Sequence, residues 1–189
     1  MTAWPAGTGR PLASLVNASV ADDVVPNLVV LPLGADGKVS LYTSGGGHLV
    51  LDVFGWFTDE TAPESDSGLF VPVSPIRVLD TRTALGVTTG RMAPGGTLSL
   101  RFAGAAGIPL TGAAAVVTNL TVAEATAPGF LTAWIPPAPR PNVSNVNATA
   151  LGQDVANLAV VGLSSDGVMS FFSQSGGHLV ADVAGWFTA

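Results

Sequence analysis

Two identical histidine–aspartate spacings are the chain's most obvious candidates for chemistry. His48 and Asp52 lie in the segment GGHLVLDVFGWF, and His178 and Asp182 lie in GGHLVADVAGWF. In a helix this spacing would place an imidazole and a carboxylate one turn apart, where both could contact one metal ion or exchange a proton. In a strand the same spacing is about 13 Å, which is too long for either role. The secondary structure therefore decides between a duplicated site and a duplicated strand.

The residues around each histidine favour the strand. Glycines precede the histidine, and Val, Leu, Phe and Trp dominate the residues that follow. We therefore predict a strand in each copy, with no catalytic residue and no metal site. Asp52 and Asp182 then need polar partners within half-buried strands, and Arg77 or Arg82 could supply one to Asp182.

The other polar candidates are better explained by structure than by chemistry. Asp80 begins the tripeptide DTR, which we interpret as a turn-forming aspartate followed by a structural arginine. We interpret the recurrent asparagines as loop-tying or cross-strand hydrogen bonders: Asn17, Asn27, Asn119, Asn147 and Asn157. The chain lacks a G-x-S-x-G motif, and its glutamates fall in predicted linker or turn. We expect no cofactor and predict that the chain is not an enzyme.

Aromatic side chains offer a different kind of site, a platform on which sugar rings stack. The candidates are Trp4, Trp56, Trp134, Trp186 and Tyr42. All four tryptophans of the chain belong to its duplicated part, as expected for a repeated ligand surface. Packing in a core or an interface is the alternative role for the same side chains.

The composition favours an all-β protein. Hydrophobic residues make up 48% of the 189 residues and charged residues only 11%, yet no apolar run approaches the roughly 20 residues of a membrane-spanning helix. The apolar runs are short and are separated by 23 glycines and 14 prolines. The net charge of −6 and the scattered arginines argue against a nucleic-acid partner. With no cysteine, the chain has neither disulfides nor thiolate metal sites.

An internal repeat organises the chain. At an offset of 130 residues, Thr2–Thr58 aligns with Thr132–Thr188 without a gap, and 28 of the 57 aligned residues are identical. Residues 59–67, DETAPESDS, are acidic and read as a solvated linker. We therefore predict a complete repeat unit at residues 68–189, with residues 1–58 as the C-terminal half of a preceding unit. A weaker similarity within the unit leaves open the alternative that the chain consists of three sub-repeats of about 60 residues in one compact domain.

The strand pattern predicts an antiparallel β-sandwich of the jelly-roll or Greek-key kind. Strands are predicted at Phe70–Ser74, Arg77–Asp80, Thr97–Ala103, Ala114–Val122, Phe130–Ile135, Ser144–Ala150, Ala156–Leu163, Val168–Ser173 and His178–Phe187. Residues 2–58 would then supply about five strands with unpaired edges and one uncovered apolar face. We expect the rest of the chain, an adjacent repeat or another copy of the chain to cover them.

The order of motifs resembles a repeated module of predicted secreted actinobacterial proteins. That module runs RLLDTR, NVTV, GYLTVYPCG, SNLN, NLVVVPVG-DGKVCIYT and HLVVDV-GYF. The corresponding motifs are RVLDTR at Arg77–Arg82, NLTV at Asn119–Val122, GFLTAW at Gly129–Trp134, SNVN at Ser144–Asn147, NLAVVG at Asn157–Gly162 and HLVADVAGWF at His178–Phe187. The back half recurs at Thr2–Phe57. The module's cysteines fall on Ala6 and Ser40, and again on Pro136 and Ser170, so the resemblance implies that each pair is close in space.

The resemblance implies an extracellular or cell-surface location and brings no catalytic residues with it. We predict a non-catalytic, exported, structural or adhesive β-repeat module that forms part of a cell-surface or extracellular assembly. Its partners would be other copies of the chain or adjacent repeats. One alternative is a carbohydrate-binding accessory module of a secreted hydrolase, which would bind cell-surface glycan. A second alternative is a surface or tail protein of a phage virion.

Overall fold

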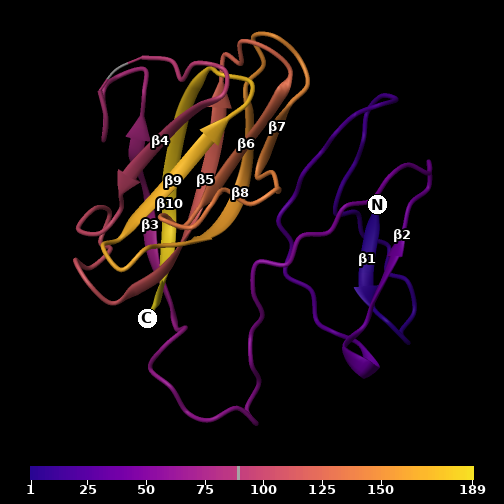
Figure 1. The fold of residues 1–189 in the computed structure, drawn as a ribbon. Helices are drawn as coiled ribbons and strands as arrows, with labels where there is room; N and C mark the ends of the chain where they lie inside the picture. Colours follow the sequence, from indigo (N-terminus) through magenta and orange to yellow (C-terminus); the bar gives the residue numbers. More distant parts are fainter. Residues whose placement is uncertain (89) are drawn as a thin grey trace. The chain divides into compact units, whose positions relative to one another are not determined.

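The computed structural model describes residues 1–88 and 90–189 and shows an all-β protein (Figure 1). The chain divides into two compact units, Met1–Asp52 and Val53–Ala189, rather than forming the single compact domain of the three-sub-repeat alternative. The predicted repeat boundary after residue 58 falls inside the second unit. None of the described residues belongs to a helix long and apolar enough to cross a bilayer.

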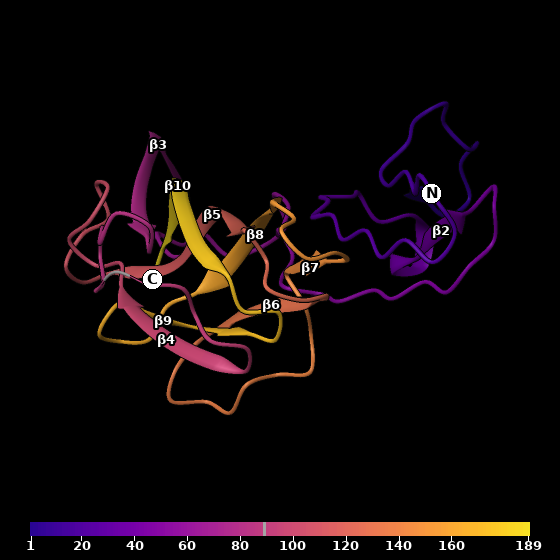
Figure 2. The same ribbon diagram turned by 90° about the horizontal axis from the view of Figure 1, so that it is seen from above.

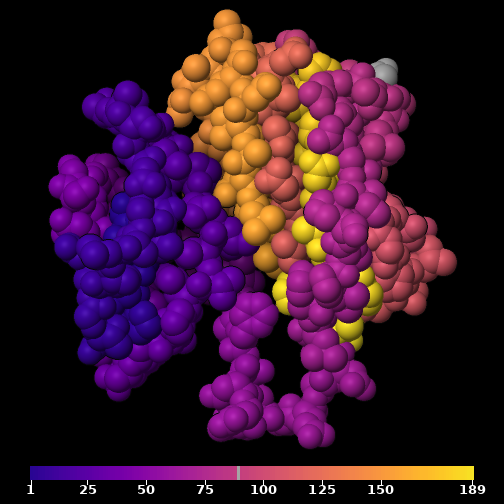
Figure 3. All heavy atoms as spheres, turned by 180° about the vertical axis from the view of Figure 1, so that it is seen from behind, coloured from indigo at the N-terminus to yellow at the C-terminus, as the bar shows by residue number. Residues whose placement is uncertain are grey.

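The second unit contains two antiparallel sheets. Its strands are β3 (Phe70–Asp80), β4 (Gly96–Arg101), β5 (Ala113–Ala123), β6 (Gly129–Trp134), β7 (Val146–Ala148), β8 (Val155–Gly162), β9 (Val168–Ser173) and β10 (His178–Thr188). One sheet has the order β3-β10-β5-β8 and the other the order β4-β9-β6-β7. Figure 2 shows the two layers, and in Figure 3 the strands of the first sheet follow one another from orange β8 through β5 and yellow β10 to magenta β3.

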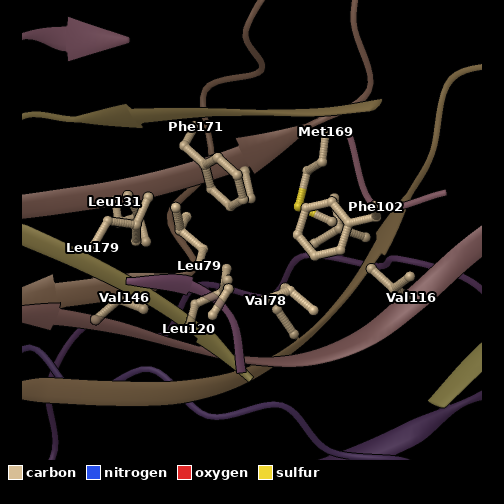
Figure 4. Close-up of a cluster of buried hydrophobic side chains, with 14 of the residues drawn as sticks. Val78, Leu79, Phe102, Val116, Leu120, Leu131, Val146, Met169, Phe171 and Leu179 are labelled. Atoms are coloured by element: carbon tan, nitrogen blue, oxygen red, sulfur yellow. The ribbon is translucent and has the colours of Figure 1, made fainter. Parts of the chain in front are cut away.

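The topology is that of a jelly roll. Apart from the β6–β7 hairpin, each successive strand from β3 to β10 crosses to the opposite sheet, so that the first and last strands of the unit become neighbours. This confirms the predicted all-β antiparallel sandwich. The core lies between the two sheets, where alternate residues of each strand face inward. Figure 4 shows Phe102, Met169 and Phe171 on one side of this core and Val78, Leu79 and Leu120 on the other.

Strand β3 is longer than the sequence predicts. The sequence predicts two separate strands here, Phe70–Ser74 and Arg77–Asp80. They form one strand, which pairs with β10 through two register shifts, at Ala181/Asp182 and Val183/Gly185. Because β3 is an edge strand, a proline can lie in it without removing a hydrogen bond that a second neighbour would need.

The beginning and the end of this jelly roll meet. The backbone N–H of Gly68 donates to the carbonyl of Thr188 at 2.9 Å, and the N–H of Thr188 donates to Leu69 at 3.0 Å. The hydroxyl of Thr188 also donates to the carbonyl of Asp66 at 2.6 Å. The chain therefore enters and leaves this unit at one point.

The first unit contains much less regular structure. Strands β1 (Thr2–Pro5) and β2 (Val39–Tyr42) form an antiparallel pair, and the 3-10 turn η1 (Ala35–Gly37) leads into β2. The Asp-Gly turn that the sequence indicates is present, with left-handed φ values of 61° at Asp36 and 67° at Gly37.

The contacts that do form in the first unit repeat those of the second at the 130-residue offset. The register of β1 with β2 pairs Trp4 with Ser40, as β6 with β9 pairs Trp134 with Ser170. Ala6 and Pro136 lie two residues after Trp4 and Trp134. The positions at which the module has cysteines, Ala6 with Ser40 and Pro136 with Ser170, are therefore on neighbouring strands or just beyond the end of one. The β1–β2 pair therefore has the same register as the β6–β9 pair at the 130-residue offset.

The other strands expected in residues 2–58 do not form, so that part of the prediction is wrong. Residues 25–32 correspond to β8 and residues 48–58 to β10. In the complete unit β8 pairs with β5, and β10 lies between β3 and β5. The partner strands β3 and β5 both belong to residues 68–130, and this segment has no counterpart in the first copy. Without neighbouring strands to pair with, residues 25–32 and 48–58 form no regular structure.

Candidate functional site

The most highly charged cluster of the complete unit surrounds Asp80, at the end of β3. Its Oδ1 accepts hydrogen bonds from the backbone N–H and the Nε of Arg82, at 3.0 and 2.9 Å. Its Oδ2 accepts from both Arg82 and Arg77, at 2.8 and 3.2 Å. The hydrogen bond from the Arg82 side chain is the main reason why the pKa of this buried carboxyl lies well below its usual range. The DTR turn is therefore held by an ion-pair network.

Arg77 connects this turn to strand β10. Its Nε and one terminal nitrogen donate to the two carboxylate oxygens of Asp182, at 2.8 and 3.1 Å. This bidentate pair raises the pKa of Arg77 above its ordinary value. Of the two arginines that the sequence offered to Asp182, Arg77 is the one that binds it.

The histidine and aspartate of the complete unit lie on one strand and bind different partners. Nδ1 of His178 is 3.0 Å from the Thr81 hydroxyl, which also accepts a hydrogen bond from the N–H of Leu179 at 3.1 Å. Asp182 is held by Arg77. Among the described residues no group of three or more metal-ligating side chains comes together. The arrangement ties β10 to the DTR turn.

Two asparagines at equivalent positions tie the same loop in both copies. Nδ2 of Asn27 donates to the carbonyl of Leu15, and Nδ2 of Asn157 donates to the carbonyl of Asn145, both at 2.8 Å. Asn17 accepts a hydrogen bond from the hydroxyl of Ser14 at 2.5 Å.

The other two predicted asparagines lie on strands. Asn147 is in β7, opposite Phe130, and Asn119 is in β5, where its register partners are Asp182 and Leu158. The sequence missed Asn145, whose buried side chain accepts a hydrogen bond from the N–H of Ala133 at 2.7 Å.

The tryptophan candidates have different environments. The indole N–H of Trp4 donates to Thr8 at 3.1 Å, and that of Trp134 donates to Ala138 at 2.9 Å, so each fixes a turn after its strand. Within the second unit Trp134 and Trp186 lie on different sheets. Trp186 packs against the core and its buried indole nitrogen has no partner among the described residues, whereas Trp56 is 82% exposed.

Tyr42 belongs to an open depression in the first unit, with both polar and apolar side chains in its lining. The guanidinium of Arg10 lies 3.9 Å from the centre of its ring, as that of Arg140 lies 4.0 Å from the ring of Phe172 in the second copy. The depression has a volume of about 360 Å³ and is lined by Thr2, Arg10, Pro11, Leu12, Ala13, Ser14 and Tyr42. It combines an aromatic ring, a guanidinium and two hydroxyls.

The most unusual surface of the protein is the apolar segment at residues 48–58. Val50 and Val53 are 84% and 86% exposed, whereas their counterparts Val180 and Val183 are 2% and 0% exposed. The same contrast holds for Leu49 and Leu51, which are exposed while Leu179 and Ala181 are buried, and Phe54 is exposed as well. Large apolar side chains gathered on one segment mark an interaction site more often than a free surface. No family model, curated protein or solved structure matches the chain.

Proposed function

We propose that the protein is a non-catalytic structural module of an extracellular or cell-surface assembly. The observation that carries the proposal is the contrast between the two copies of one sequence. Core side chains of the complete unit such as Leu179 and Val183 have counterparts in residues 48–58 that are exposed to solvent. A chain that keeps these residues apolar instead of replacing them with polar ones is suited to binding other protein surfaces.

The polar clusters support a structural role. Asp80, Arg77, Arg82 and Asp182 bind one another, and the hydrogen bonds of His178 run to Thr81 at the end of β3. These side chains join the DTR turn to β10 and so stabilise the jelly roll. The export that the sequence motifs imply fits a module of this kind.

Sedimentation velocity over a range of protein concentrations tests the proposal. We expect reversible association that weakens when Val50 and Val53 are both replaced by lysine, because each charge would have to be desolvated in the contact. Leu151→Lys is the matched control, since Leu151 is also exposed, at 76%, but lies in the complete unit. A wild-type chain that is monomeric at every concentration would refute the proposal.

Glycan binding is a second candidate, favoured by the depression beside Tyr42. Its guanidinium and hydroxyl groups suit the hydrogen bonding of sugar hydroxyls, and its aromatic ring suits stacking. Binding to a glycan array should then be lost in Tyr42→Ala, while Phe172→Ala, the equivalent change in the second copy, serves as the matched control. Equal binding by both variants would show that the depression beside Tyr42 is not a glycan site.

A further inference from the structure

The complete unit shows what residues 2–58 lack. We call residues 68–130 the front segment, which carries β3, β4 and β5, and residues 2–58 and 132–188 the two back segments. In the complete unit β10 is hydrogen bonded on one side to β3 and on the other to β5. Residues 48–58, its counterpart, form no strand pair on either side. Both sides of residues 48–58 are therefore without a backbone partner of the kind that β10 has.

The register of the complete unit predicts what would lie on each side. Ala181 is opposite Leu79 of β3 and Leu120 of β5. Its counterpart is Leu51, so apolar side chains at these two positions of a partner would cover Leu51. The apolar residues on either side of Leu51 would be covered in the same way by alternate residues of the partner strands.

Two side chains of the first back segment differ in size from their core counterparts in opposite directions. Leu51 is larger than Ala181, which is completely buried, while Leu41 is smaller than Phe171, which is also completely buried and belongs to the same core cluster. At these two positions a loss of volume on one sheet accompanies a gain on the other. Compensation of this kind matters for side chains packed together and has no purpose for exposed ones.

A free carboxylate adds a requirement for charge. Asp182 is paired with Arg77 of the front segment, whereas Asp52 is exposed and forms no ion pair within the described part of the chain. A partner strand with an arginine at the position of Arg77 would meet it with the bidentate geometry seen in the complete unit.

A second copy of the chain cannot meet this need. Each copy has one front segment and two back segments, so any number of copies leaves half of the back segments without a front segment. The complete unit also keeps its own front segment engaged through the long pairings of β10 with β3 and β5. Copies of the chain can therefore associate through their exposed apolar side chains, but they cannot supply these strands to one another. The partner that fits is a further segment of the front type.

We infer that residues 2–58 form an acceptor for the strands of a further segment built like the front segment, with a β3-like strand and a β5-like strand flanking residues 48–58. The partner would carry alternating apolar residues facing the core and an arginine opposite Asp52. This inference rests on the proposed role in an assembly and names the kind of partner that the assembly supplies.

Hydrogen exchange followed by mass spectrometry tests the inference on the full chain. The probe is a second copy of residues 68–131 fused directly before Thr2, in place of Met1. In the unfused chain the amides of residues 48–58 should exchange as in an unstructured peptide, and those of 178–188 slowly. The fusion should slow exchange at 48–58 by at least about a hundredfold. The two peptides differ in mass because Leu51 and Phe54 replace alanines.

Variants of the fused chain separate strand insertion from non-specific contact. Changing the added copies of Leu79 and Leu120 to aspartate should abolish the protection, because no core can then close. Leu51→Ala should speed exchange at 48–58 more than tenfold in the fused chain and change nothing in the unfused one. Adding Leu41→Phe should restore protection, since the pair then matches Phe171 and Ala181.

Two results would overturn the inference. One is equal exchange at residues 48–58 with and without the fused segment. The other is slow exchange there in the unfused chain, which would mean that the segment is already covered. Association of the unfused chain, measured by sedimentation, is a separate readout, so the assembly role can stand if strand acceptance fails, and the reverse.

Discussion

The repeat allows one substitution to be made twice, at equivalent residues in opposite environments. Leu179 in β10 is 1% exposed and belongs to the core cluster, whereas Leu49, its counterpart in the first copy, is 43% exposed. Both are leucines followed by valine and preceded by histidine. Differences in intrinsic strand propensity therefore cancel, and the comparison isolates burial.

Leu179→Ala should cost the complete unit about 3 kcal/mol or more of unfolding free energy. Buried leucine-to-alanine changes cost roughly 2–5 kcal/mol, and the upper part of this range applies where neighbouring side chains cannot relax into the cavity. The register neighbours of Leu179 include Val122, which is 2% exposed, so little space is free for collapse. Leu49→Ala should change stability by less than about 0.5 kcal/mol.

Urea unfolding followed by far-ultraviolet circular dichroism measures both values. The midpoint should fall for Leu179→Ala with the slope m unchanged, and both should stay at the wild-type values for Leu49→Ala. A 3 kcal/mol loss corresponds to more than a hundredfold change in the ratio of folded to unfolded protein. Equal destabilisation by the two changes would show that residues 48–58 are packed like β10, and would refute the contrast in burial.

Three further predictions follow from the polar and aromatic contacts. Because the pKa of Asp80 is lowered in the fold, its contribution to stability is complete above the unfolded value of about 3.9 and is lost as the pH falls below it, so Asp80→Asn should flatten the acid limb of a stability–pH curve. Asp182→Asn should lower stability by up to about 1 kcal/mol in urea unfolding, and Asp52→Asn should not change it. Trp56→Phe should remove the fluorescence that acrylamide quenches most readily, and Trp186→Phe should leave it in place, as steady-state quenching will show.

The sequence predicts well those features that depend on short stretches of chain. The Asp-Gly turn before β2, the strand at His178–Thr188 and the turn after Asp80 are each encoded by residues close together. The repeat adds more, because a contact such as Asn157 with Asn145 implies the equivalent contact of Asn27 with Leu15.

The sequence predicts poorly those features that depend on a partner strand. Residues 48–58 have nearly the same sequence as β10 and a different structure, because a strand needs neighbours and the neighbours of β10 come from residues 68–130. Repetition also misleads as a guide to importance. The buried Asn145 side chain accepts a hydrogen bond from the N–H of Ala133, but its counterpart in the first copy is a leucine, so the repeat does not mark it as important.

The meeting of Gly68 with Thr188 has a mechanical consequence. Strands β3 and β10 are antiparallel neighbours whose free ends lie together. A force that separates these two ends acts first on the hydrogen bonds nearest to them, and then on the next ones in turn. The hydrogen bonds therefore break one after another instead of bearing the force together. A module loaded in this direction should yield at low force and act as an extensible link, while a force that slides paired strands lengthwise past each other would load their hydrogen bonds together and meet more resistance.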